Sequence, residues 1–432
     1  MTTASLHRRS PSSPAASPLD DDDLLREILL RLPPQPSSLP RASAVCKRWL
    51  RLAADPGFFR RFRRHHNRNP PLLGFFNGSN ALTFVPTLKS PNSVDPGRFS
   101  LPSGLDDCFH CFGCRHGLVL IFLRTRVQVL VWDPVTGDQH CFAIPPGIAR
   151  YAGRTLINGA VLRAAGDVQH FKVVLAMTDG DQQHTRVLAC VYSSRTGSWG
   201  NLVSVPLLYK ANGCLYPTLI DMNDAVLAGD SLYWVLVGNS YRILEFDLVK
   251  QSLDVIQVPA DMCGDANHVR IMRAEGGGLG VLLVSSSYYT LQLWKRNTDC
   301  DGVTSWGLGK TIALDKLLSL KSEEKVPLGL RVLGYGEDNN VLFAWTVIGV
   351  FMIHLKSMKF EKLFEAKTIS FSRFYPFESV YSAADTGYSI NVLVVDMAEL
   401  RLCAIRKMTI RLDMLVDLLI EQVSSQSYIL VA

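Results

Sequence analysis

One short stretch of the sequence concentrates side chains that bind metals: Cys108, His110, Cys111, Cys114 and His116. Thiolate and imidazole groups are the ligands that zinc prefers in proteins. Side chains on a strand alternate between two faces, so these five cannot all converge on one ion. No second ligand pair follows at zinc-finger spacing. The stretch therefore favours a structural role, and we expect no bound metal.

A glycine run at 275–280, EGGGLG, has the composition of a phosphate-binding loop. Such a loop needs a following Lys and Ser/Thr and a helix whose amide groups bind the phosphate. Here the strand-like segment VLLVSSS follows instead. We interpret the run as a turn and expect no cofactor. The sequence also lacks the serine-hydrolase elbow and the HExxH zinc motif.

Basic side chains cluster near the N-terminus and could contact phosphate groups: Arg60, Arg61, Arg63, Arg64, His65, His66 and Arg68. Residues 1–70 hold 13 basic and 6 acidic residues, a net charge of +7, whereas the remainder has a net charge of −1. The interleaved Phe59 and Phe62 indicate helix packing, and the large neutral remainder has no second basic stripe. This pattern favours a solvated helix end over a nucleic-acid site.

Composition bounds the class of protein. The 432 residues are 47% hydrophobic and 19% charged, which is typical of a globular chain with two or three domains. No apolar run follows Arg8-Arg9, so no secretory signal is expected. The apolar segment 341–355 is shorter than the roughly 20 residues that span a membrane. Ten scattered cysteines indicate reduced thiols, which predicts the cytoplasm and/or nucleus.

Three short helices separated by prolines are predicted between residues 18 and 62. The acidic run 20–23 suits a helix N-terminus, and apolar residues at helical spacing follow it up to Pro33 and Pro34. A second helix begins near Ser37 or Ser38. The third ends at residues 55–57, DPG. A unit this small and this rich in leucine cannot bury all its apolar surface alone, so it requires a partner.

These residues resemble an F-box. Residues 24–33 read LLREILLRLP, 45–52 read VCKRWLRL and 55–59 read DPGFF, in the order and spacing of that family. The opening pair is Pro18-Leu19, inverted relative to the family's leucine-proline. The resemblance implies docking on a Skp-type adaptor, and through it on a cullin scaffold. The adaptor-binding residues it implies are Leu19, Leu24, Ile28, Leu32, Pro33, Leu39, Val45, Cys46 and Trp49.

From Leu72 onward, β-branched and aromatic runs alternate with Gly, Asp, Asn and Ser turns, a pattern typical of strands. Five units repeat loosely, with equivalent positions at Asp133, Ser193, Asp247, Lys295 and Lys356. This period of about 50–60 residues suits a four-stranded propeller blade. A segment at each end, Leu72–Phe84 and Ser379–Ile405, raises the count to about seven blades.

The predicted architecture is therefore multidomain: a small all-α F-box of three helices followed by an all-β domain, most simply a β-propeller of about seven blades. A pair of β-sandwiches is the alternative fold. The turns CRHGL (114–118) and VWDPVTG (131–137) also resemble those of F-box-associated propellers common in plants. The predicted segments are a disordered tail (1–17), the F-box (18–62), a linker (63–71), the propeller (72–410) and a C-terminal helix and tail (411–432).

The resemblance implies a non-catalytic substrate-recognition subunit of an SCF-type cullin-RING ubiquitin ligase. The propeller would bind an unidentified client protein, with no nucleic acid, membrane or cofactor involved. Two alternatives stay open. A metal-dependent or glycan-processing propeller enzyme would carry paired carboxylates or a complete ligand set at one rim. A nucleic-acid-binding protein would depend on the basic residues between 60 and 68.

Overall fold

The computed structural model describes most of the chain: residues 21–78, 81–101, 108–151, 155–163, 169–180, 185–207, 218–238, 240–263, 268–285, 287–326, 329–366 and 373–381. The predicted N-terminal tail and the predicted C-terminal helix lie outside these residues. Among the helices within them, none has the length and apolar character needed to cross a membrane.

Four helices, not the predicted three, form the described N-terminal segment: α1 (Asp22–Leu30), α2 (Ser38–Ser43), α3 (Lys47–Ala53) and α4 (Pro56–His66). The predicted third helix does end before Asp55, at Ala53, but Asp55-Pro56-Gly57 also begin α4, which was not predicted. The Asp55 carboxylate accepts a hydrogen bond from the amide of Phe58 at 2.9 Å. Pro56 occupies the first helical position, where its missing N–H costs nothing. Helix α4 also continues to His66, so the first residues of the predicted linker are helical.

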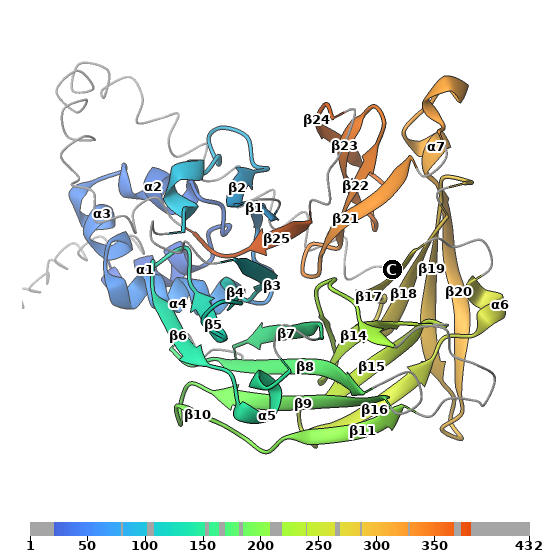
Figure 1. Cartoon of the computed structure of the whole chain (residues 1–432). Coiled ribbons are helices and arrows are strands. Elements are labelled where there is room, and N and C mark those ends of the chain that lie inside the picture. Colours follow the sequence, from blue (N-terminus) through green and yellow to red (C-terminus); the bar gives the residue numbers. More distant parts are fainter. Residues whose placement is uncertain are drawn as a thin grey trace, which may run out of the picture. The chain divides into compact units, whose positions relative to one another are not determined.

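Six antiparallel sheets follow in the described residues, which we call blades 1 to 6 (Figure 1). Blade 1 contains β3 (Phe109–Arg115), β4 (Leu118–Leu123), β5 (Gln128–Trp132) and β6 (Gln139–Ala143). Blade 2 contains β7 (Ile157–Leu162), β8 (Lys172–Gly180), β9 (Thr185–Ser193), β10 (Ser198–Trp199) and β11 (Val203–Leu207). Blade 3 contains β12 (Leu219–Ile220), β13 (Val226–Ala228), β14 (Ser231–Val237), β15 (Arg242–Asp247) and β16 (Ser252–Gln257).

Blade 4 contains β17 (His268–Arg273), β18 (Leu279–Ser285), β19 (Thr290–Thr298) and β20 (Thr304–Ala313). Blade 5 contains β21 (Leu330–Gly336), β22 (Val341–Thr346), β23 (Gly349–His354) and β24 (Phe360–Phe364). Blade 6 contains β1 (Leu72–Gly78), β2 (Leu82–Pro86) and β25 (Phe374–Glu378). Short helical turns connect some blades: α5 (Pro146–Ala149), α6 (Ala260–Cys263), α7 (Leu314–Leu317), η2 (Pro96–Phe99) and η3 (Ser322–Glu324).

The blades form a closed ring, which confirms the predicted propeller. Strands near the axis contact their neighbours in a continuous cycle, from β25 to β3 and back through β21 to β25. A hydrophobic core fills each gap between adjacent blades, and Trp234, Phe343 and Phe377 are among its fully buried side chains. The sheets are therefore held face to face by apolar burial, the dominant favourable term in folding.

The predicted count of about seven blades was wrong by one. Residues 72–84 do not form a separate blade, because β1 pairs with both β2 and β25 in a single sheet. The other predicted terminal unit, Ser379–Ile405, lies outside the described residues beyond residue 381. In Figure 1 the red-orange β25 lies beside β1 although the two strands come from opposite ends of the propeller sequence. The first strand to be made and the last described strand thus close the ring through hydrogen bonds.

Candidate functional site

Helix α1 presents apolar side chains in two directions. Its first turn is capped by the Asp21 carboxylate, which accepts hydrogen bonds from two backbone amides at 2.7 and 3.2 Å. Leu25 and Leu29 are fully buried against the other N-terminal helices. Leu24 and Ile28 lie one position earlier, and Leu24 is 50% exposed. Because residues four apart share a helix face, these two form an apolar strip on the surface.

Nine residues were predicted to contact an adaptor. Leu19 lies outside the described residues, and the other eight divide into two groups. Leu39 and Trp49 are buried among the helices, so they support the surface from within. Six others keep part or much of their surface accessible: Leu24, Ile28, Leu32, Pro33, Val45 and Cys46. Adaptor contact itself stays a prediction for all nine.

Two ion pairs that were not predicted from the sequence hold α1 against α3 and α4. Arg48 donates to Asp22 at 2.6 Å, and Arg61 donates to Glu27 at 2.7 Å. The hydrogen bond from Arg48 lowers the pKa of Asp22. These partners are 26 and 34 residues apart in sequence, so no local spacing could have identified them. The opposite charges of the acidic run and the arginine cluster were the available signal.

Some basic side chains of the cluster at residues 60–68 bind other parts of the protein, and the others are exposed to solvent. Arg61 is engaged with α1, and the guanidinium of Arg63 is 13% exposed and bound to Asp133. The His66 ring lies 2.9 Å from the carbonyl oxygen of Leu30. Three of the seven basic side chains therefore have partners within the protein, which weakens the interpretation of the cluster as a nucleic-acid patch.

A single buried carboxylate joins the N-terminal helices to the propeller. Asp133, in the turn after β5, is 3% exposed. One of its oxygens accepts hydrogen bonds from the amides of Val135 (3.0 Å) and Thr136 (3.3 Å), which closes the VWDPVTG turn. Its other oxygen accepts from Arg163 of blade 2 at 2.9 Å and from Arg63 of α4 at 3.4 Å. One side chain thus links α4 and the first two blades.

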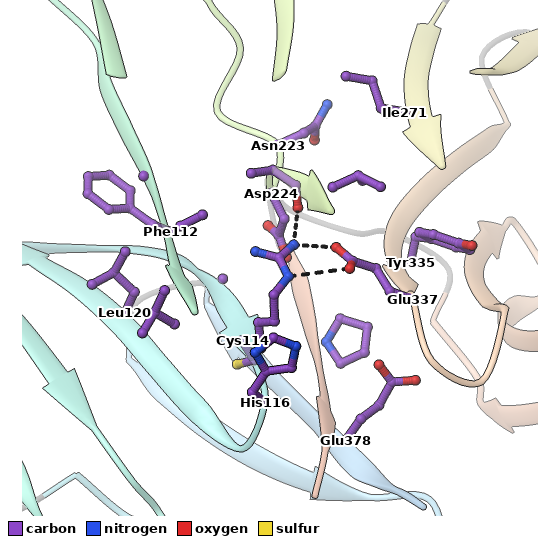
Figure 2. Close-up of a pocket in the computed structure, with 18 of the residues that line it drawn as sticks. Phe112, Cys114, His116, Leu120, Asn223, Asp224, Ile271, Tyr335, Glu337 and Glu378 are labelled. Atoms are coloured by element: carbon purple, nitrogen blue, oxygen red, sulfur yellow. Dashed lines mark hydrogen bonds and ion pairs between the residues drawn. The ribbon is translucent and has the colours of Figure 1, made fainter. Parts of the chain in front are cut away.

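A polar cavity lies near the axis of the propeller, between strands of several blades (Figure 2). Arg115 at the end of β3 donates to both carboxylate oxygens of Glu337 and, at 2.5 Å, to the carbonyl oxygen of Ala225. Arg273 also approaches Glu337, at 3.4 Å. Asp224 reaches the same space because Gly113, with φ of +138°, leaves no Cβ in its way. Partners up to 222 residues apart in sequence meet here.

This cavity is too small for a substrate. Its volume is about 40 Å³, which has room for only a few water molecules, because each needs about 10–15 Å³. The carboxylates are also engaged: Glu337 binds two arginines, and Glu378 accepts from the amides of Asp338 (3.1 Å) and Asn339 (2.8 Å). The ion pairs near the axis therefore link neighbouring blades, and this arrangement suits a structural role better than a catalytic one.

The buried axial carboxyls should make folding sensitive to pH. Burial raises the pKa of Asp224 to about 7 and that of Glu378 to about 7, from 3.8 and 4.5. Between about pH 4 and pH 7 these two groups bind more protons in the folded protein than in the unfolded chain, so their contribution to the free energy of unfolding falls as pH rises. Burial lowers the pKa of His110 to about 4 and that of His116 to about 3, which gives a contribution of opposite sign below about pH 6.5. We expect a slope of at most about 1.4 kcal/mol per pH unit for each group. Urea unfolding at pH 5.5, 6.5 and 7.5 measures it.

The variant Asp224→Asn isolates one group, because it removes the contribution of Asp224 and leaves the histidines in place. The free energy of unfolding of the wild type relative to this variant should fall from pH 5.5 to pH 7.5. A difference that stays constant or rises over this range would contradict the assignment.

The cysteine and histidine stretch lies on and beside β3. A β-bulge between Cys111 and Gly113 shifts the alternation of side chains, so Cys111 and Cys114 pack into the same core. Burial raises the pKa of the Cys114 thiol well above its usual value, which disfavours the thiolate that metals require. His116 accepts a hydrogen bond from the amide of Arg163 at 3.0 Å. Within the described ranges, no three His, Cys, Asp or Glu side chains are grouped to hold a metal.

We expect treatment with a chelator to leave the melting temperature unchanged, because no metal contributes to folding. Differential scanning fluorimetry with and without EDTA, together with metal analysis of the untreated protein, tests this. Stoichiometric zinc that disappears in a Cys111→Ser/Cys114→Ser variant would refute the expectation and favour the enzyme alternative.

Comparison with known families agrees with this architecture. A family model described as F-box-like matches residues 22–65, which covers the four N-terminal helices. A second, described as F-box protein AT5G49610-like, beta-propeller, matches residues 110–384. The first model matches the helical part of the chain and the second matches the β part, in the order that the structure shows.

Individual proteins are similar at a lower level. The chain is 24% identical over 268 residues to the F-box/kelch-repeat protein At3g17530 of Arabidopsis thaliana, covering 59% of this chain and 64% of that protein. It is 25% identical over 256 residues to the F-box protein At5g03970 of the same plant, covering 56% and 58%. The chain thus spans about three fifths of the length of these curated relatives.

Among solved structures, apo AztD from Citrobacter koseri is similar with a TM-score of 0.30 and 9% identity, over 61% of this chain and 72% of that one. Likeness at this level does not bear on function. The propeller family model, by contrast, covers more than half of the chain and lies C-terminal to the F-box match. This chain belongs to the family of F-box proteins with an AT5G49610-like β-propeller.

Proposed function

We propose that this protein is the substrate-recognition subunit of an SCF-type cullin-RING ubiquitin ligase. The observation that carries the proposal is the apolar strip of Leu24 and Ile28, with Val45 and Cys46 also exposed, on a helical unit that matches the F-box family. Exposed apolar side chains also occur on the propeller, as at Val303 and Leu308, so the support comes from the position of this strip within the F-box match. A Skp-type adaptor would bury them and connect the chain to a cullin scaffold.

In this function the chain performs no chemistry on its client. The propeller holds the client, and the scaffold brings a client lysine close to a charged conjugating enzyme, which raises the effective concentration of the reacting groups. The filled axis of the propeller supports a binding role, because its carboxylates are engaged by arginines and backbone amides. We further propose that the protein acts in the cytoplasm and/or nucleus.

Reconstitution tests the proposal directly. The full chain, co-expressed with a Skp-type adaptor, should elute with it as a 1:1 complex in size-exclusion chromatography with light scattering. Adding the cullin and its RING partner should then produce a larger complex. Client candidates come from pulldowns in cells with and without an inhibitor of cullin neddylation, read by mass spectrometry. A chain that is monodisperse and folded, yet captures no adaptor from any of several Skp-type homologues, would refute it.

A further inference from the structure

A second and larger cavity opens beside the junction of α4 with the propeller. Its volume is about 760 Å³, within the range of sites that bind small molecules or short peptide segments. It extends from Arg68, which follows α4, across the loops of blades 2 and 3 to Asp338 of blade 5. We call it the basic groove. It adjoins the axial cavity, with which it shares His116 and Asp338, and none of its lining residues belongs to the apolar strip on α1.

Positive charge dominates the groove. Among its described lining residues, five are Arg or Lys and two are Asp, a net charge of +3: Arg68, Arg163, Lys172, Arg195, Arg273, Asp230 and Asp338. Two of the arginines are already engaged, since Arg163 binds Asp133 at 2.9 Å and Arg273 binds Asp338 at 3.5 Å. A ligand would therefore contact the basic side chains at the solvent-exposed edge of the groove, which we call its rim.

Arg68 and Lys172 are exposed at that rim, and neither forms an ion pair with any residue that the structure describes. The two cations line one groove although they are 104 residues apart in sequence, and the described lining holds more basic than acidic side chains. An anionic ligand would be attracted to this excess of positive charge, and a partly enclosed groove strengthens the attraction relative to open solvent.

The floor of the groove selects among anions. Leu227 and Leu248, both half-buried, also line it and form what we call the leucine floor, whereas Leu162 and Phe171 are largely buried beneath the lining. A free phosphate would leave this apolar surface uncovered. Single-stranded nucleic acid needs accessible aromatic rings on which bases stack, and Phe171 is only 5% exposed. A peptide that alternates acidic with apolar side chains satisfies both parts of the groove.

We infer that the basic groove binds an acidic peptide segment, with carboxylate or phosphoryl groups at Arg68 and Lys172 and apolar side chains on the leucine floor. The inference deepens the proposed function, on which it rests for biological meaning, by naming the chemical class of segment that a client would present. The groove needs only this chain, however, so binding is measurable without any ligase component.

Fluorescence anisotropy with the purified full chain tests the inference. The probe is a fluorescein-labelled 12-residue peptide of interspersed Asp and Leu, compared with a version carrying phosphoserine and a neutral version carrying Asn in place of Asp. Both anionic peptides should bind at least about tenfold more tightly than the neutral one, and the difference should shrink as salt is added. A labelled oligothymidine of matched length serves as the nucleic-acid probe.

Charge reversal locates the site. The variant Arg68→Glu/Lys172→Glu should weaken binding of the acidic peptide by about tenfold or more, because it converts attraction to repulsion at both rim positions. Lys316→Glu/Lys356→Glu makes the same change in net charge at exposed positions outside the groove and should stay within about twofold of wild type. Circular dichroism checks folding, and Arg68→Ala/Lys172→Ala provides a milder variant.

Three outcomes would overturn the inference: equal binding of the neutral peptide, equal losses in the two charge-reversal variants, or tighter binding of oligothymidine than of the acidic peptides. Adaptor capture is measured separately and should be the same for Arg68→Glu/Lys172→Glu as for wild type. A chain that binds the acidic peptide at Arg68 and Lys172 but captures no adaptor would refute the proposed function and leave the groove assignment standing.

Discussion

Replacing Leu24 and Ile28 together by alanine is expected to abolish capture of the Skp-type adaptor while leaving the protein folded. Leu24 is 50% exposed and Ile28 is partly exposed, so their truncation removes little from the core of the chain itself. At a buried interface, loss of two such anchors costs about 2–5 kcal/mol, or several decades of affinity. Surface plasmon resonance with immobilised adaptor, at equal protein concentrations, measures the loss.

Matched controls distinguish a lost contact from a lost fold. Val303→Ala/Leu308→Ala removes two comparably exposed apolar side chains from the propeller, at 62% and 51% exposure, and should leave adaptor affinity unchanged. The F-box interface would be refuted if Leu24→Ala/Ile28→Ala bound the adaptor as wild type does, particularly if charge reversal of Arg60 and Arg64 abolished binding instead.

Asp133→Ala should lower the free energy of unfolding by about 3–5 kcal/mol, the usual consequence of removing one partner from a buried ion pair. The substitution leaves Arg63 and Arg163 at 13% and 10% exposure without the carboxylate that both of them bind. It also removes the acceptor that closes the turn after β5. Urea unfolding followed by tryptophan fluorescence gives the free energy.

Two further variants separate these contributions. Asp138→Ala alters an exposed carboxylate in the same turn and should cost far less. Asp133→Ala/Arg63→Met replaces one stranded charge with an apolar side chain of similar length, so it should recover part of the loss. If Asp133→Ala proved no more harmful than Asp138→Ala, the link between α4 and the propeller would have no energetic weight.

Local signals in the sequence predicted the parts of this fold that local physics determines. Acidic caps, proline stops and leucine spacing located the N-terminal helices, and the repeated strands of blades 1 to 5 fall in the predicted units. The residues DPG at 55–57 show the limit of such signals. They separate two helices: α3 ends at Ala53, and the Asp55 carboxylate, which accepts from the amide of Phe58, caps the start of α4 that was not predicted.

Nonlocal pairing accounts for what the sequence could not reveal. The innermost strand of several blades was missed, because strands such as β17 (HVRIMR) mix polar and apolar residues around the axis. The blade count depended on a hydrogen-bonded partnership between β1 and β25 that no composition records. In the candidate site, exposure separated Leu24 from the buried Leu39 and Trp49, although all three suited the motif equally.

The sharing of blade 6 between β1 and β25 has a consequence for the order of events on the ribosome. The four N-terminal helices are complete once His66 has emerged, whereas the ring cannot close until β25 has been made. At about 5–20 residues per second, some 300 further residues take roughly 15–60 s. During that interval a nascent chain could offer its adaptor surface before any finished client domain exists. A translation product that stopped before β25 would hold this state permanently and, under the proposed function, would occupy ligase scaffolds without delivering a client.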